Sequence, residues 1–257
     1  MVVFETELFK VFALVLMRFG GLIVSAPILG SRNFPVIAKI GLAGLCALLV
    51  TPSVPALEQR LPDDPIPFAM MGAGELMIGL MMGFVMTITF AGIQVAGQLM
   101  DMQTGFGMMN VFNPVLETQF PIFGFYFFII AVLYLLVLNG HHMMLRYMVH
   151  TFDKIPLGGF VARPALFLEV GRWGRVMFFD GLLIAAPVAG AMMLAYITMG
   201  LLGRAVPQIH LFVVGFPITI TVGLLMVALV TGVYLQVLDG MFERMFTNVE
   251  TLIGGLG

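Results

Sequence analysis

The chain has 257 residues, of which 60% are hydrophobic and only 10% are charged, with a mean hydropathy of +1.06. Soluble domains carry about 25% charged residues, so this composition excludes an ordinary water-exposed surface and places the chain in lipid or in a large apolar assembly. The net charge of −2 leaves no basic patch to neutralise phosphates, which argues against nucleic-acid binding. The single cysteine, Cys46, excludes an internal disulfide and a thiolate metal cluster.

Several apolar runs exceed the roughly 18 residues that indicate a transmembrane helix. The first, about Leu8–Leu29, is expected to direct insertion itself, because no cleavable signal peptide precedes it. Arg18 interrupts this run, at a cost of about 2.5–3.5 kcal/mol on insertion scales. Two interpretations stay open: its side chain extends to the membrane surface, or it pairs inside the protein, with Glu75 as the nearest acid by type. Pro27 is expected to end the run, and the shorter stretch Val36–Val50 forms the second apolar segment.

The third run, Ile66–Met100, is too long for one upright crossing. At 1.5 Å per residue it would form a helix of about 52 Å, against about 30 Å of hydrocarbon. It is therefore expected to tilt strongly, to break into a hairpin, or to pack on protein. Gly79 with Gly83, and Gly92 with Ala96, form small-residue pairs that let neighbouring helices approach closely.

A polar break follows this run, from Asp101 to Pro121, and reads DMQTGFGMMNVFNPVLETQFP. It keeps many apolar side chains, which a water-exposed linker would lack. In a bilayer, non-helical backbone is tolerated only where protein buries it or where it lines a cavity. We therefore expect this central stretch to face a pore or pathway.

The second half contains three more apolar runs. The aromatic run Pro121–Leu138 is followed by the least hydrophobic region, Arg146–Arg175, which we expect to be a basic loop. Val176–Leu202 is the fifth run, and His210–Leu235 is the sixth, with a break expected at Pro217 and a weakly amphipathic tail beyond it. The topology stays open, because the basic loop changes sides according to whether the third run crosses once or forms a hairpin.

The sequence contains no enzyme signature: both the zinc-binding motif H-E-x-x-H and the nucleophile motif G-x-S-x-G are missing. His141 and His142 are adjacent and would point about 100° apart on a helix, although with His150 and Asp153 they leave a metal site as a minor alternative. Three acids are candidates for a proton relay but lack a shared helical face, namely Asp101, Glu117 and Asp180. We expect no catalytic residue, no cofactor and no metal.

The 22 methionines are concentrated in the third run and the central stretch. Methionine is flexible and suits surfaces that repack, although plain apolar filling explains the helical ones equally well. Met108 and Met109 stand beside Gly105 and Gly107. For this pair we favour a soft, movable seal.

Taken in order, the polar and breaker residues resemble the FliR/SctT family of export-gate subunits, which serves flagella and virulence type III secretion. The resemblance covers nearly the whole chain and rests on these residues: Arg18, Ala26-Pro27, Pro35, Lys39, Glu75, Gly79, Gly83, Gly97, Asp101, Gln103, Gly105-Phe106, Asn139-Gly140-His141, Pro156-Leu157-Gly158, Ala186-Pro187, Arg204, Pro207-Gln208 and Gly215-Phe216-Pro217.

This resemblance implies an all-α membrane protein, built from bent and broken helical hairpins packed into a heteromeric helical gate. It implies one copy of the chain beside FliP-like and FliQ-like subunits, with FlhB-like and FlhA-like export components nearby, in the bacterial inner membrane at the flagellar basal body. Residues 1–200 would be FliP-like and residues 201–257 FliQ-like. The channel would pass unfolded exported proteins.

In that family the central loop acts as a plug, and the matching positions here are about 105–120. The implied plug residues are Gly105, Phe106, Gly107, Met108, Met109, Asn110, Val111, Phe112, Asn113 and Pro114. Pairing between helices or subunits is expected for Arg18, Glu75, Asp101, Gln103 and Arg204. Family members commonly have Asp-Pro where this chain has Asn113-Pro114, so any contact that relies on that negative charge is in doubt.

Three other functions remain as alternatives. The first is the virulence counterpart of the same gate. The second is a small-molecule secondary transporter, favoured by helices expected to break at Pro27, Pro187 and Pro217. A weak internal repeat, in which residues 21–28 resemble residues 181–188, favours the transporter too. An intramembrane enzyme is the third, and it lacks a catalytic constellation.

Overall fold

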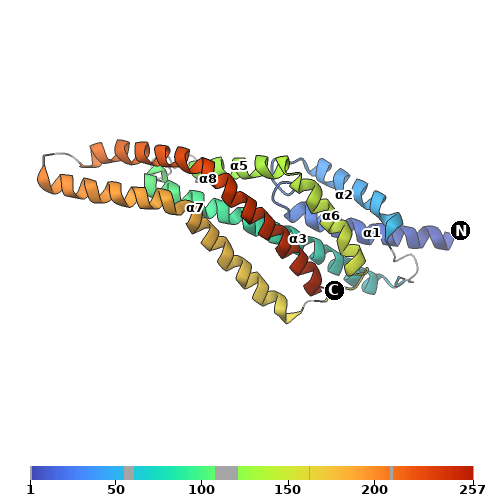
Figure 1. The fold of residues 1–257 in the computed structure, drawn as a ribbon. Helices are drawn as coiled ribbons and strands as arrows, with labels where there is room; N and C mark the ends of the chain where they lie inside the picture. The colour runs from blue at the N-terminus through green and yellow to red at the C-terminus, as the bar shows by residue number, and fades with distance from the viewer. Residues whose placement is uncertain (1, 55–60, 108–120, 162, 209–210, 257) are drawn as a thin grey trace. The chain divides into compact units, whose positions relative to one another are not determined.

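The structure is a computed structural model that describes residues 2–54, 61–107, 121–161, 163–208 and 211–256 of the chain. All regular elements in these residues are helices (Figure 1), which confirms the predicted all-α fold. In chain order they are α1 (Val2–Ser25), α2 (Val36–Val50), the 3₁₀ turn η1 (Thr51–Ser53), α3 (Pro65–Thr104), α5 (Ile122–Val137), α6 (Gly140–Lys154), α7 (Pro164–Ala205) and α8 (Leu211–Leu256).

Five of the described helices are long and apolar enough to cross a membrane, namely α1, α2, α3, α7 and α8. The bent pair of α5 and α6 would be a sixth span if it counts as one. Asn139 makes the turn between α5 and α6 in the left-handed conformation, which asparagine tolerates better than most residues. The chain is therefore a multi-pass membrane protein.

Helix α3 is a single unbroken helix of 40 residues. The hairpin considered for this run is therefore wrong. More than half of its most apolar stretch is buried, so the expectation that it packs on protein is confirmed. Its calculated length is about 60 Å, which exceeds the hydrocarbon core by a factor of about two.

Proline does not interrupt the long C-terminal helices. Helix α7 continues through Pro187 and α8 through Pro217, so the predicted breaks at Pro187 and Pro217 are both wrong. The basic loop expected at Arg146–Arg175 is also wrong, because α6 and the start of α7 occupy most of it. The expected tail is part of α8. In an apolar environment a helix satisfies nearly all its backbone groups internally, so one lost hydrogen bond does not end it.

The described chain divides into two compact units, and α3, α5, α7 and α8 each contribute residues to both. Unit 1 contains Met1–Ile88, Leu135–Trp173 and Glu243–Gly257. Its buried residues come chiefly from α1, α3 and α6 and include Leu14, Phe19, Leu22, Ile78, Met82 and Met148. A β-carbon added to Gly21 of α1 would lie 2.5 Å from the carbonyl oxygen of Leu76 in α3. Glycine at this position lets the two backbones touch. A β-carbon on Gly79, from one of the predicted small-residue pairs, would likewise overlap the Arg18 carbonyl oxygen in α1.

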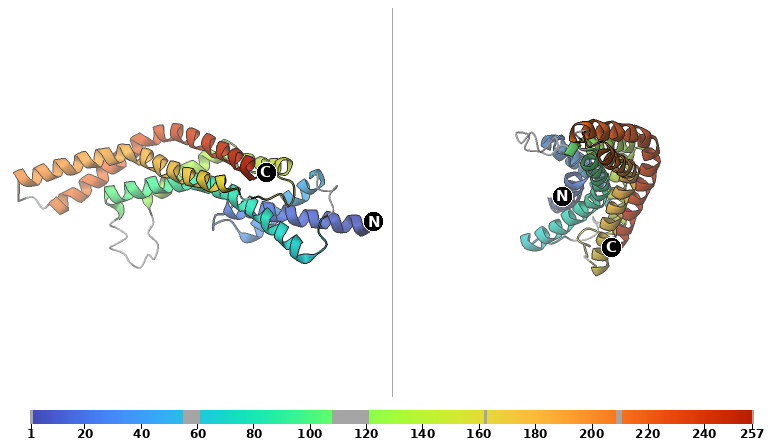
Figure 2. Two further views of the ribbon diagram at one scale, coloured as in Figure 1. Left: turned by 90° about the horizontal axis from the view of Figure 1, so that it is seen from below. Right: turned by 90° about the vertical axis from the view of Figure 1, so that its left-hand side faces the viewer.

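Unit 2 contains Thr89–Tyr134 and Gly174–Phe242. Within it, α7 and α8 form an antiparallel hairpin, and the two helices lie side by side in Figures 1 and 2. Helices α5 and α8 run parallel in a matched register. The Tyr126 hydroxyl lies 3.2 Å from that of Thr231, and the Tyr134 hydroxyl donates to Asp239 eight residues further along both helices.

Candidate functional site

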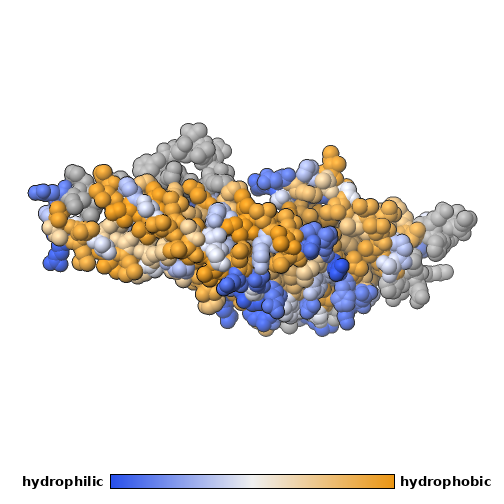
Figure 3. Space-filling model, turned by 45° about the horizontal axis from the view of Figure 1, so that its top comes forward, coloured by the Kyte–Doolittle hydropathy of each residue, from blue (hydrophilic) through white to orange (hydrophobic). Residues whose placement is uncertain are grey.

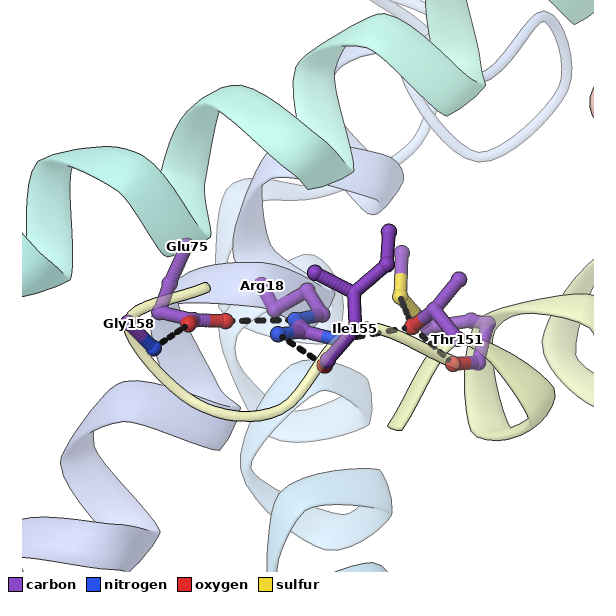
Figure 4. A network of polar contacts seen from close by, with 6 residues as sticks. Arg18, Glu75, Thr151, Ile155 and Gly158 are labelled. Atoms are coloured by element: carbon purple, nitrogen blue, oxygen red, sulfur yellow. Dashed lines mark hydrogen bonds and ion pairs between the residues drawn. The ribbon is translucent and has the colours of Figure 1, made fainter. Parts of the chain in front are cut away.

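A buried ion pair joins three elements of unit 1 (Figure 4). Arg18 of α1 and Glu75 of α3 are both fully buried, and the Arg18 Nε donates to Glu75 Oε2 at 2.5 Å. The same guanidinium donates to the Thr151 hydroxyl of α6 at 2.9 Å and to the Ile155 carbonyl at 3.2 Å. Glu75 is therefore the partner of Arg18, as one of the two sequence-based interpretations proposed.

The second oxygen of Glu75 is also satisfied, because the Gly158 N–H donates to it at 2.8 Å. The Arg18 guanidinium lies 4.2 Å from the centre of the Phe152 ring, within the range of a cation–π contact. Buried charges persist in proteins when they are paired and hydrogen-bonded in this way. The network ties α1 and α3 to α6 and to the turn that follows α6.

Unit 2 contains the base of the central stretch, where α3 ends and α5 begins. Asp101 stands in the last turn of α3 and is 4% exposed. Its carboxylate accepts hydrogen bonds from the backbone N–H groups of Phe123 at 3.1 Å and Gly124 at 3.4 Å. These belong to the first turn of α5, whose N–H groups have no acceptor inside their own helix. Asp101 therefore caps α5 from a different helix.

Two further contacts join the same helix ends. A β-carbon on Gly97 of α3 would overlap the α-carbon of Gly124 in α5, so the two backbones touch there. The Phe106 ring lies edge-on to the Phe123 ring, with 5.2 Å between their centres. The start and the end of the central stretch are thus held together at three points.

Helices α7 and α8 pack against the residues where the stretch leaves α3. The Tyr196 hydroxyl of α7 donates to the backbone carbonyl of Gln103 at 2.5 Å. Gly105 has φ +91, and a β-carbon there would lie 3.3 Å from the Phe216 ring of α8. Both the backbone conformation and the space at this position favour glycine.

The remaining predicted plug residues, Met108 to Pro114, lie outside the described residues, as does Glu117. Gly107 is described and half-buried. The part of residues 105–120 that the structure describes is therefore its beginning alone. The plug itself stays a prediction.

Other residues singled out from the sequence lie in separate places. Arg204 is exposed in the last turn of α7 and makes no ion pair with a described residue, so its expected pairing stays a prediction. Asp180 is buried in α7. The His141 and His142 rings lie 4.1 Å apart, and His150 contacts Asp153 at 3.3 Å. Among the described residues, no group of three or more potential metal ligands occurs.

Sequence reasoning missed the backbone partners of both clusters. The Ile155 carbonyl and the N–H groups of Phe123, Gly124 and Gly158 carry no signal in residue identity. One available signal was the acid Asp101, placed where a negative charge opposes the dipole of its own helix. Such a placement indicates that the carboxylate serves another element.

These features define a multi-pass helical membrane protein with a buried ion pair in one unit and, in the other, a polar stretch whose two ends are joined. Residues 9–245 match the family model of the bacterial export proteins, family 1. The chain therefore belongs to this family, the FliR family of bacterial export proteins.

Curated relatives cover nearly the full length. Flagellar biosynthetic protein FliR of Escherichia coli (strain K12) is 30% identical over 241 residues, which are 94% of this chain and 92% of the relative. FliR of Pectobacterium carotovorum subsp. carotovorum is 31% identical over 243 residues, 93% of this chain and 89% of the relative. FliR of Bacillus subtilis (strain 168) is 28% identical over 256 residues, 98% and 97% of the two chains.

Proposed function

We propose that this chain is a subunit of the flagellar protein export gate in the bacterial inner membrane. Its role is structural and gating rather than catalytic. The observation that carries the proposal is the joined base of residues 105–120, where the end of α3 is held to the start of α5. Membership of a bacterial export family and the flagellar names of the relatives support it.

In this proposal, residues 105–120 form a plug in the path of unfolded exported proteins. A resting channel must stop small ions, and it must yield when a chain arrives. Methionine and small apolar side chains can repack around different occupants, and the sequence places Met108 and Met109 at this point. The left-handed Gly105 sets the direction in which the stretch leaves α3.

The proposed partners are FliP-like and FliQ-like membrane subunits, with FlhB-like and FlhA-like components nearby. A large exposed apolar surface supports such an assembly: apolar side chains cover much of the face shown in Figure 3. On α7 and α8 of unit 2 the exposed apolar residues include Phe178, Phe179, Leu182, Leu224, Leu225 and Leu229. Lipid and neighbouring subunits would share this surface, and a division into FliP-like and FliQ-like parts belongs to the same proposal.

The flagellar assignment is preferred to two of the three sequence-based alternatives, the virulence counterpart and the small-molecule transporter. The relatives described above are flagellar proteins rather than virulence proteins. The transporter hypothesis was based on a weak internal repeat and on breaks at three prolines; α1 ends before Pro27, but α7 and α8 continue through Pro187 and Pro217. No observation on the described residues favours a second function.

Deletion of residues 108–113 tests the plug. Cells that carry the deletion are expected to leak small ions through resting gates, because the segment that fills the path is shortened. The amount of assembled complex should stay normal, since the joined base lies outside the deletion. Passive ion flux into membrane vesicles, normalised to assembled complex, is the measurement. A flux equal to that of the unaltered chain would overturn the plug assignment.

A further inference from the structure

We propose that Asp101 is a positioning residue that clamps the end of α3 to the start of α5, the two helix ends between which residues 105–120 run. The proposal rests on the plug function proposed above and adds to it the residue that holds the base of the plug. The clamp consists only of described residues, on α3 and at the start of α5.

The start of α5 needs an acceptor from elsewhere. Pro121 occupies the N-cap position, since its carbonyl accepts the first helical hydrogen bond from Phe125 at 2.9 Å. A proline side chain offers no acceptor, whereas serine, threonine, asparagine and aspartate at this position cap their own helix. The N–H groups of Phe123 and Gly124, which have no acceptor inside α5, are instead satisfied by Asp101.

The carboxylate is suited to this N-terminus and poorly suited to its own helix. Asp101 lies in the last turn of α3, where the helix dipole disfavours a negative charge, while the first turn of α5 favours one. The residue is almost fully buried, so its removal leaves two buried N–H groups without their acceptor. Its loss therefore weakens the joint between α3 and α5 as well as the start of α5.

The other two contacts at the base cannot replace the clamp. The Gly97–Gly124 contact is van der Waals contact between backbones, which lets one helix slide over the other. The Phe106–Phe123 contact is a single ring pair. Asp101 supplies the directional hydrogen bonds that fix the register between the end of α3 and the start of α5.

The test separates clamping from helix capping. Asp101→Ala removes both effects, whereas Asp101→Ala combined with Pro121→Ser gives α5 a cap of its own without restoring the link to α3. Asp239→Ala is the matched control: it removes an acidic acceptor for α5 in the same unit, at the Tyr134 hydroxyl near the other end of the helix. Passive ion flux into vesicles is measured per assembled complex for all three, beside the 108–113 deletion.

We expect a several-fold rise in resting flux for Asp101→Ala, a rise that persists in the Pro121→Ser double variant, and normal flux for Asp239→Ala. Normal flux in the double variant would show that capping alone matters and would overturn the clamp. Normal flux in Asp101→Ala beside a leaking deletion would overturn the clamp and leave the plug intact. A deletion that does not leak would overturn the plug and the clamp with it. Where Asp101→Ala lowers assembly too far, Asp101→Asn replaces it, with an intermediate rise expected because one acceptor oxygen remains.

Discussion

At the scale of single residues, the Arg18–Glu75 pair shows how a charge is kept inside an apolar protein. Neither side chain is exposed, and every oxygen of the carboxylate has a donor. Removing one partner leaves the other charge buried without compensation, which typically costs about 3–5 kcal/mol in soluble proteins, whereas replacing both can be nearly neutral. The pair is therefore expected to behave as one unit.

A double-mutant cycle tests this expectation. Arg18→Met and Glu75→Gln should each lower the thermal stability of the detergent-solubilised protein strongly. The combined variant should be more stable than either single one, because no buried charge remains and the glutamine oxygen still accepts from Gly158. Losses that simply add would show that the two side chains act independently.

Residue types predicted some of these contacts and concealed others. Arg18 and Glu75 are found from the cost of an isolated charge in an apolar run. Asp101 is expected from the sequence to pair between helices or subunits, but its partners are backbone N–H groups of α5, which begins 21 residues later, and residue types cannot identify them. Residue types locate a charge in an apolar run, whereas only the fold shows which backbone group forms a hydrogen bond with it.

At the scale of helices, the apolar runs located most elements, while breaker residues located their ends less well. Helix α2 matches its predicted bounds, Val36–Val50. Pro65 and Pro164 stand at the first helical positions of α3 and α7, where the missing N–H costs nothing. Pro187 and Pro217 lie inside helices, so proline alone does not end a helix in this protein.

Two adjacent glycines in α1 offer a direct test of helix packing. A β-carbon on Gly21 would meet backbone atoms of α3, whereas a β-carbon on Gly20 meets nothing within 4 Å. Gly21→Ala should destabilise the protein by about 1–3 kcal/mol through overpacking. Gly20→Ala should be neutral or slightly stabilising, since alanine favours a helix. Thermal melting in detergent compares the two, and equal effects would exclude the close approach as the cause.

At the scale of the whole molecule, the amount of exposed apolar surface exceeds what a lone water-soluble chain would tolerate. Large apolar side chains are exposed on every long helix, from Phe9 in α1 to Val233 in α8. Composition alone predicts this surface, but it cannot separate the part that contacts lipid from the part that contacts other subunits. That distinction requires the assembly.

The composition of the assembled complex tests the export-gate proposal as a whole. A tagged copy of this chain, extracted gently from its own host, is expected to migrate in a large heteromer with one copy of this chain among several copies of two other small membrane proteins. Native mass spectrometry measures the ratio directly. This result is expected because the apolar residues of α7 and α8 are exposed in the isolated chain, and neighbouring subunits would cover them. A monomer or homodimer that survives mild detergent would contradict the export-gate proposal and would make transport of small molecules the function to test.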